Sequence, residues 1–378
     1  MARKLGIVTI VDHANFGNRL QNYAVQEVLK SLGFDPETIP SRRFDGLDAL
    51  RRIRYLREKL LVSASESNIL GDLGSNAVRA IEARKHRSLI MAKAAAGRHF
   101  SRAHIKESAA HLTPVGLSGA RVEDYDYFVV GSDQVWKPAY RNGAGPEFLD
   151  FAPPEKRIAY SASFGVSVIP PVFVARYRKG IGSMSAVSVR EIAGKHIVET
   201  LCGFTPAVTI DPTLMLSAAQ WRSVAKAHAR KPGAGYVLQY FLSRPSADTD
   251  RAIGALVEEG GLEAVRLADV GRPEFYDAGP AEFLDLVGGA SVMCTDSFHG
   301  VIFSIIFGCP FVVFTRAGSG AAMNSRIETL LESFGLQDRL YRGGRLDPGQ
   351  EGIGSRVPGE RLEAARKHSL GYLTSALS

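Results

Sequence analysis

Short apolar segments recur along the chain, and most are followed by a polar turn and an amphipathic stretch. The spacing predicts a first series of strands at residues 5–11, 127–131, 158–163, 185–189 and 208–211, and a second series at 236–240, 264–267, 291–294 and 310–315. Strands that alternate with helices favour parallel pairing, because each crossover returns the chain to the same edge of the sheet. The predicted fold class is therefore α/β, with two Rossmann-like, doubly wound parallel-sheet domains facing a cleft.

The length of 378 residues supports a division into two domains. Single hydrophobic cores stop growing at about 250–300 residues, so a longer chain tends to form a second core. We place an N-terminal α/β domain at residues 1–212, with a basic and mostly helical insertion at about 42–110. A C-terminal α/β domain follows at 213–345, and a tail with a terminal helix at 346–378.

The composition, 45% hydrophobic and 22% charged, is that of an ordinary globular protein. Cys202, Cys294 and Cys309 lie in apolar surroundings without metal-ligand spacing, which favours a reducing compartment and no metal site. The apolar segment 6–11 is too short for a secretory signal, and glycine and proline interrupt the longest apolar run, 301–314. We expect a cytoplasmic protein.

The net charge of +7 is concentrated in one region. Residues 41–110 carry fifteen Lys or Arg against seven Asp or Glu. Such a region can lie against an anionic membrane or an anionic substrate, and a solvated helical surface is the alternative. No recognition motif for nucleic acid accompanies it, so no nucleic-acid partner is expected.

The run Cys294–Phe303 is the most informative stretch of the chain. It predicts the end of a strand, a polar turn and the first turn of a helix. Such a helix end presents unpaired N–H groups and about half a unit of positive charge, which favours phosphate or carboxylate. His299, next to Asp296 and Ser297, could act there as an acid or base. Capping side chains beside a packed histidine are the structural alternative.

A second stretch, residues 125–136, predicts a strand that runs into a Gly-Ser-Asp turn followed by a tryptophan. Together with the motifs at 15–18 (NFGN), 188–191 (SVRE), 211–213 (DPT) and 297–300 (SFHG), it resembles the polysaccharide pyruvyl transferase family. The order and spacing fit nearly the whole chain. No single motif is specific, but the ordered set is.

The resemblance implies a fold and an activity. The family is understood to adopt the B-type glycosyltransferase architecture, with the C-terminal domain binding the donor. The enzyme would transfer the enolpyruvyl skeleton of phosphoenolpyruvate to a sugar, forming a pyruvate ketal and releasing phosphate. The acceptor would be a sugar or lipid-linked oligosaccharide in the biosynthesis of a cell-surface polysaccharide such as an exopolysaccharide. The mechanism requires no metal and no cofactor besides phosphoenolpyruvate as co-substrate.

The resemblance also implies residue roles on the donor side. His299 is expected to be the catalytic acid that protonates the donor's methylene carbon. Arg190 is expected to bind the donor carboxylate, with a salt bridge to Glu191 as the structural alternative. Ser297 and Gly300 at the helix end are also expected to contact the donor. Many members carry Arg-Leu-His-Gly where this chain has Ser-Phe-His-Gly at 297–300, so that arginine is missing here.

Two arginines are candidates to replace it, Arg316 after the last predicted strand and Arg326 further on. The glycines Gly318 and Gly320 between them would allow a ligand to approach the backbone closely. A plain surface arginine is the alternative for each.

The residues expected to bind the acceptor lie at two other strand ends. Asp133 and Gln134 could hydrogen-bond sugar hydroxyls, with Trp136 as a stacking platform; a structural turn with a buried tryptophan is the alternative. Asn15 and Asn18 begin the first helix and could meet a substrate, although capping alone explains Asn15.

Two other function classes remain open. A nucleotide-sugar-dependent glycosyltransferase could use the same architecture, since fold does not fix function, and Glu328 or Glu332 could then bind a ribose. A non-catalytic glycan-binding protein is less favoured, because it would not need His299, Arg190 and Asp133 together at strand ends. Asp211 reads as a turn near the domain junction.

Overall fold

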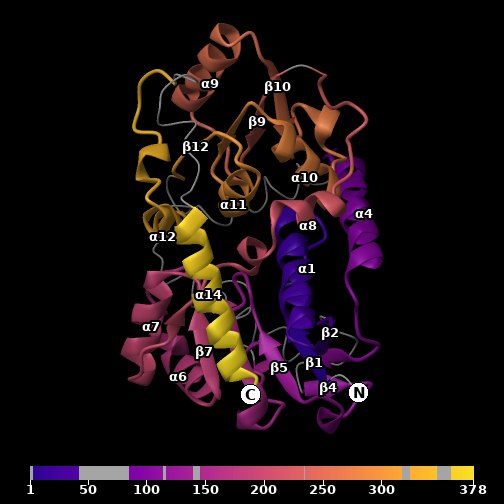
Figure 1. Cartoon of the computed structure of the whole chain (residues 1–378), viewed down its shortest axis with the longest axis vertical. Helices are drawn as coiled ribbons and strands as arrows, with labels where there is room; N and C mark the ends of the chain where they lie inside the picture. Colours follow the sequence, from indigo (N-terminus) through magenta and orange to yellow (C-terminus); the bar gives the residue numbers. More distant parts are fainter. Residues whose placement is uncertain are drawn as a thin grey trace.

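The computed structural model of the chain describes residues 3–41, 85–113, 116–138, 145–233, 235–316, 324–346 and 359–378. Figure 1 shows two halves, each built on its own sheet, with the C-terminal half at the top. Both sheets are parallel throughout, which confirms the predicted α/β class. Parallel sheets need helices on their faces, and the alternating sequence supplies them.

The N-terminal sheet has six strands in the order β2-β1-β5-β6-β7-β8. Their bounds are β1 Arg3–Val8, β2 Phe34–Thr38, β5 Tyr127–Val130, β6 Arg157–Ala162, β7 Ala186–Val189 and β8 Ala207–Val208. The helices of this half are α1 Phe16–Ser31, α4 Arg87–His104, α6 Val174–Gly182 and α7 Ile192–Cys202. A small hairpin, β3 His111–Thr113 and β4 Gly116–Ser118, stands apart from the sheet.

The C-terminal sheet has four strands in the order β10-β9-β11-β12. Their bounds are β9 Tyr236–Tyr240, β10 Glu263–Leu267, β11 Val292–Thr295 and β12 Phe311–Val313. The helices are α8 Ala218–Ser223, α9 Ala247–Glu259, α10 Pro280–Gly289, α11 Phe298–Phe307 and α12 Asn324–Phe334. Helix α11 is apolar on nearly all sides, and it is therefore buried in the core of this half.

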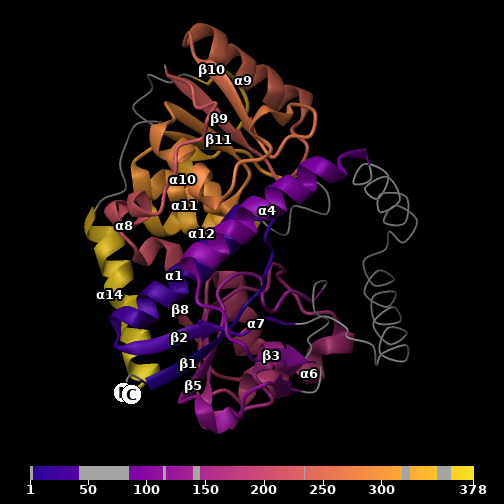
Figure 2. The ribbon, with the colours of Figure 1, turned by 90° about the vertical axis from the view of Figure 1, so that its right-hand side faces the viewer.

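The last helix, α14 (Gly359–Ala376), returns from the C-terminal half to pack on the N-terminal sheet (Figure 1). Tyr372 donates a hydrogen bond to the carbonyl of Ala159 at 2.7 Å. Arg366 donates to the carbonyl of Leu214 at 2.7 Å, in the segment that joins the halves. The helix expected in the tail is thus part of the N-terminal half, and the two chain ends lie together (Figure 2).

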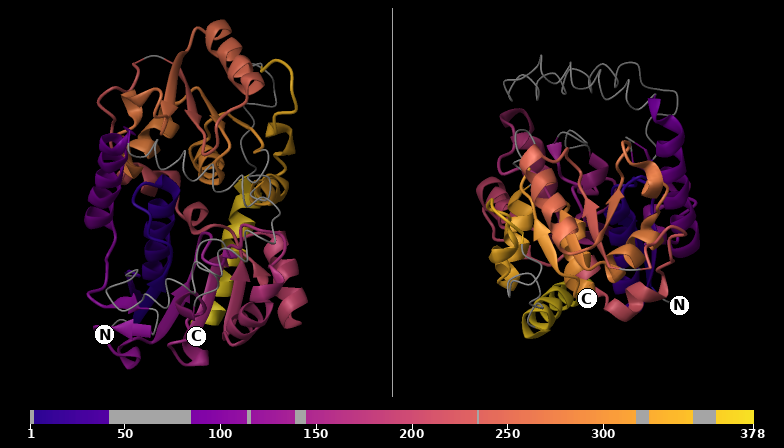
Figure 3. Two further views of the ribbon diagram at one scale, coloured as in Figure 1. Left: turned by 180° about the vertical axis from the view of Figure 1, so that it is seen from behind. Right: turned by 90° about the horizontal axis from the view of Figure 1, so that it is seen from above.

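Helix α4 also connects the halves, because it contacts both α1 and α10 (Figures 2 and 3). Helix α4 also lies close to the loop after β1, since a Cβ added at Gly97 would lie 1.9 Å from the carbonyl oxygen of His13. Of the predicted basic insertion at 42–110, residues 42–84 lie outside the described residues, so its character stays a prediction. Gly318 and Gly320 lie outside them as well. In the described ranges no helix is long and apolar enough to cross a membrane.

Candidate functional site

The strand order in each sheet reverses at one place, between β1 and β5 and between β9 and β11. Open α/β sheets bind ligands at the carboxyl ends of the strands where this reversal occurs. Here the loops that follow these four strands meet at the junction between the halves. Phe16 after β1, for example, packs against Tyr240 at the end of β9, with ring centroids 5.4 Å apart. The site is therefore assembled from both halves.

His299 lies in the first turn of α11, directly after β11. Ser297 caps this helix by accepting a hydrogen bond from the backbone N–H of Gly300 at 3.3 Å. The residue is only 7% exposed, and its imidazole packs on α1, where a Cβ added at Gly17 would lie 2.1 Å from its Nδ1. Its Nε2 is 3.8 Å from a carboxylate oxygen of Asp211 and has no hydrogen-bond partner among the described residues.

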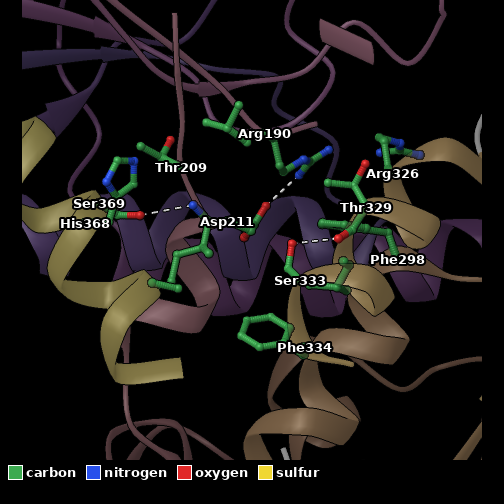
Figure 4. A pocket seen from close by; sticks show the side chains of 14 residues that line it. Arg190, Thr209, Asp211, Phe298, Arg326, Thr329, Ser333, Phe334, His368 and Ser369 are labelled. Atoms are coloured by element: carbon green, nitrogen blue, oxygen red, sulfur yellow. Dashed lines mark hydrogen bonds and ion pairs between the residues drawn. The ribbon is translucent and has the colours of Figure 1, made fainter. Parts of the chain in front are cut away.

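Asp211 places a fully buried carboxylate at the centre of the site. One oxygen accepts hydrogen bonds from the backbone and the hydroxyl of Thr213, at 3.0 and 2.6 Å. The other accepts from Ser132 at 3.2 Å and from Nη1 of Arg190 at 2.5 Å. Nη2 of Arg190 is 3.5 Å from Asp133 (Figure 4 shows the Arg190–Asp211 pair). Arg190, after β7, therefore joins carboxylates that follow β8 and β5.

Asn18 joins the loops after β1 and β5. Its Nδ2 donates to Asp133 at 3.0 Å, while its Oδ1 accepts from the backbone of Asp12 and from Arg19, both at 2.8 Å. Arg19 is itself buried and donates to the carbonyl of Ile10 at 2.9 Å. Because donors surround Oδ1 on one side, the amide of Asn18 is fixed with its N–H groups toward Asp133.

Burial and charge act in opposite directions on the titratable groups. Burial alone would raise the pKa of Asp133, but Arg190 and His299 outweigh it and lower this pKa to about 2. The same balance lowers the pKa of Asp211. Burial lowers the pKa of His299, and the two carboxylates offset this only in part. Both carboxylates are therefore ionised at neutral pH, whereas the imidazole needs a further anion to hold a second proton.

Phe298 lies against two guanidinium groups. Cζ of Arg190 is 4.3 Å from the ring centroid, and Cζ of Arg326 is 5.5 Å from it. The carboxamide of Gln134, with its oxygen toward Arg326, accepts from the two terminal nitrogens at 3.0 and 2.7 Å. Burial and the charge of Arg190 lower the pKa of Arg326 to about 10. The two buried cations repel each other, which favours an anion beside them.

Arg316 is held by Asp296. Its Nε is 3.1 Å from the carboxylate, and its Nη2 donates to the backbone carbonyl at 2.8 Å. The same carboxylate accepts from the backbone N–H groups of Leu242 and Ser243, at 2.7 and 3.0 Å. Asp296 thus joins Arg316 to the loop after β9. Of the two candidate replacements, Arg326 is the one whose charge acts on His299.

Three other predicted site residues have structural contacts. Asn15 caps α1 by accepting from the backbone N–H of Asn18 at 3.1 Å. A Cβ added at Gly300 would lie 2.6 Å from Oγ1 of Thr295, so this glycine lets α11 pack on β11. These contacts, with the cap that Ser297 provides, account for the three residues without a ligand, and their substrate roles stay predictions.

Trp136 is not at the surface. The residue is 1% exposed, and its Nε1–H donates to the carbonyl of Glu147 at 2.9 Å. Its ring packs on Phe164, with centroids 5.2 Å apart. The expected stacking platform is therefore corrected: the residue belongs to the core beneath the Gly-Ser-Asp turn, because the indole finds both apolar neighbours and a hydrogen-bond acceptor there.

Sequence reasoning missed two residues that shape the site. Asp211 was read as a turn, although a carboxylate before Pro212 and Thr213 is an N-cap pattern that fixes its direction. Gly17 appears in the sequence only as part of the motif at 15–18, and nothing local shows that an imidazole 282 positions away will pack on it. No group of three or more His, Cys, Asp or Glu in the described ranges could hold a metal ion.

Comparison with known proteins identifies a family. The sequence model of polysaccharide pyruvyl transferase matches residues 15–318, which contain every motif discussed above. Among proteins of curated function, none matches the chain.

Several solved structures match the chain over nearly its whole length. The S. aureus MnaA–UDP structure is 11% identical, with a TM-score of 0.48, over 99% of this chain and 97% of that one. A glycosyltransferase from Rickettsia africae is 11% identical, with a TM-score of 0.44, over 100% and 96%. These values are low, and the fold described here rests on the two sheets themselves.

Proposed function

This chain belongs to the polysaccharide pyruvyl transferase family, and we propose that it transfers the enolpyruvyl skeleton of phosphoenolpyruvate to a sugar of a polysaccharide precursor. The product would be a pyruvate ketal. In this reaction C2 of the donor forms bonds to two sugar oxygens, its bond to the phosphate oxygen breaks, and C3 gains a proton. The two hydroxyl protons leave to solvent or with the phosphate.

The observation that carries this proposal is the position of His299. Its Nε2 has no hydrogen-bond partner among the described residues, although burial makes an unsatisfied polar atom costly. It lies 3.8 Å from Asp211, which favours the imidazolium form. An anionic donor at the amino end of α11 would favour that form further. The imidazolium would then protonate C3, leaving an oxocarbenium at C2 that a sugar hydroxyl attacks.

Two arginines would hold the donor. Arg190 and Arg326 are 5% and 6% exposed, and both lie against Phe298. Charge-assisted contacts contribute about 1.5–3 kcal/mol each, so two of them can anchor a multiply charged donor. Arg326 would supply the cation that this chain lacks at position 297. The ionised carboxylate of Asp133 would accept hydrogen bonds from the sugar hydroxyls, and the amide N–H groups of Asn18 would donate to them.

A donor panel tests the proposal. Phosphoenolpyruvate at 100 times its dissociation constant should stabilise the protein by about 2.7 kcal/mol, and Arg190→Ala should remove that effect. Phosphate release should require an acceptor glycan and should be lost in His299→Gln. Stabilisation by nucleotide sugars alone would move the protein to the glycosyltransferase alternative. No observation favours that alternative, because Glu328 and Glu332, its candidate ribose ligands, are exposed on α12.

Location is a separate part of the proposal. We expect the protein in the cytoplasm, with the basic residues of 41–110 able to contact anionic lipid. Binding to anionic vesicles should weaken with added salt, since exposed charges are screened beyond about 8 Å at physiological ionic strength. Equal binding to neutral vesicles would contradict the electrostatic contact.

A further inference from the structure

Gln134 joins the two halves of the chain through Arg326. It follows Asp133 in the loop after β5, in the N-terminal half, and is only 4% exposed. Its carboxamide oxygen, in the orientation given above, accepts from Nη1 and Nη2 of Arg326 at 3.0 and 2.7 Å. Arg326 lies on α12, in the C-terminal half. One neutral side chain therefore engages both terminal nitrogens of a buried guanidinium across the junction.

The carboxamide of Gln134 is itself held by its own half. A Cβ added at Gly165, in the loop after β6, would lie 3.0 Å from Cδ of this carboxamide. Gly165 has a φ of +61°, a conformation that glycine adopts without strain. The backbone carbonyl of Gln134 accepts from the N–H of Lys137 at 3.1 Å. The loop after β6 thus packs directly on the group that holds Arg326.

Phe298 is another neighbour of this guanidinium. Cζ of Arg326 lies 5.5 Å from the ring centroid (Figure 4). An aromatic face and a carboxamide oxygen can both hold a cation without cancelling its charge, because neither is an anion. Arg326, Phe298 and Arg190 line a cavity of about 140 Å³. The charge of Arg326 therefore stays available to an anion in this space.

The neutrality of Gln134 matters for this reason. A glutamate at the same position would have nearly the same shape and could also accept from both nitrogens of Arg326. Such a pair would carry no net charge, so an anionic donor would be attracted less strongly. The carboxamide is therefore suited to orient the cation and to leave its charge to a ligand.

We propose that Gln134 is a positioning residue, which holds the guanidinium of Arg326 toward the donor from the opposite half of the molecule. The proposal rests on the function proposed above for the identity of the donor, phosphoenolpyruvate. It assigns Gln134 to the donor side of the reaction, whereas the sequence predicts that this residue binds the acceptor. It also makes the placement of Arg326 depend on the meeting of the halves, since neither half contains both residues.

Two substitutions separate the hydrogen bonds of Gln134 from its neutrality. Gln134→Met removes the acceptor, and Gln134→Glu keeps the acceptor but adds a charge. Each should raise the Kd of phosphoenolpyruvate about tenfold or more. The exposed Gln337→Glu adds the same charge at the surface and should match the wild type. At saturating donor, the KM for the acceptor glycan should stay unchanged in all three variants.

A double substitution shows whether the effect passes through the arginine. In an Arg326→Met background, Gln134→Met should not weaken donor binding further, because the group that it positions is already absent. Additive losses in the two single variants and the double variant would contradict a positioning role.

The hold on Arg326 can also be measured without any donor. A guanidinium that donates from both terminal nitrogens to one acceptor rotates slowly about its Nε–Cζ bond. NMR of protein labelled with ¹⁵N-arginine measures this rotation, and the signal of Arg326 is assigned from Arg326→Lys. The rotation should become at least about tenfold faster in Gln134→Met, and should stay slow in Gln134→Glu, which keeps both hydrogen bonds.

Three further results would overturn the proposal: unchanged rotation of Arg326 in a folded Gln134→Met, undiminished donor binding in Gln134→Glu, or a raised acceptor KM with an unchanged donor Kd. Gln134→Glu has nearly the shape of the wild type, so donor binding remains decisive if Gln134→Met does not fold. A wild type that does not bind phosphoenolpyruvate would contradict the proposed function instead, and the rotation would still decide whether Gln134 holds Arg326.

Discussion

The imidazole of His299 is held between groups with opposite effects on its charge. Burial lowers its pKa, while Asp211 and Asp133 raise it, and burial prevails. An acid catalyst must carry its proton before the donor reacts, so the free protein is not yet in the reactive protonation state at neutral pH. Binding of an anionic donor would raise the pKa of His299 and so protonate the imidazole, because a nearby negative charge favours imidazolium. Donor binding and proton binding are therefore coupled.

This coupling predicts proton uptake. At a pH above the lowered pKa of His299, phosphoenolpyruvate should bind together with up to about one proton from solvent, and the uptake should vanish as pH falls and the imidazole is already charged. Calorimetry in two buffers of different ionisation enthalpy measures it. His299→Gln is the control for protons that the donor itself takes up. Equal uptake by wild type and variant would contradict the account.

Asp211 should act as a positioning residue. Asp211→Asn keeps the shape of the side chain but removes the charge that faces both Arg190 and His299, so the pKa of His299 should fall further. The high-pH limb of the kcat profile should then move to lower pH, with kcat reduced about tenfold or more. The remote and exposed Asp150→Asn should leave the profile unchanged. A variant with lower activity but an unshifted limb would indicate a purely structural role.

At the scale of elements, the start of α1 and the start of α11 are fitted to each other. A Cβ at Gly17 would lie 2.1 Å from the imidazole, closer than any real contact. Gly17→Ala should therefore displace His299 and reduce kcat by about a hundredfold, since a misplacement of about 1 Å has that effect. Gly254→Ala in α9 meets no atom within 4 Å and should keep full activity. Near-normal turnover in Gly17→Ala would show that the packing is not required.

Helix α14 should contribute to the stability of the N-terminal half. Leu373 is fully buried, whereas Leu370 on the same helix is 39% exposed. Leu373→Ala should lower the free energy of unfolding by about 2–5 kcal/mol, and Leu370→Ala by no more than about 0.5 kcal/mol. Denaturant unfolding measures both. Equal effects would mean that α14 is only loosely attached.

The elements that the sequence predicts well are those with a strong local pattern. The apolar strands of both sheets, α1 and the terminal helix lie where their periodicity places them. Strand β2 was not predicted, because Pro36 and its charged neighbours lack an alternating pattern. Pro36 is tolerated there because β2 is an edge strand, paired on one side by β1. The burial of Trp136 after β5 has no local pattern either, because it depends on residues further along the chain.

At the scale of the whole molecule, the site depends on contacts that no local pattern contains. His299 meets Gly17 and Asp211 only because the two sheets place their reversal points against each other. The motifs could be recognised one by one, but the links between them come from the assembled fold. The role of Asp211 is a property of this junction, and it required the structure.

The central claim is that the chain transfers an enolpyruvyl skeleton after protonating it. The most direct test is to incubate the protein with phosphoenolpyruvate and an acceptor glycan in D₂O and to analyse the product by mass spectrometry and NMR. The account predicts a pyruvate ketal whose methyl group carries deuterium from solvent, formed together with phosphate and lost in His299→Gln. A ketal without deuterium, a product that contains no carbon from phosphoenolpyruvate, or full activity in His299→Gln would contradict it.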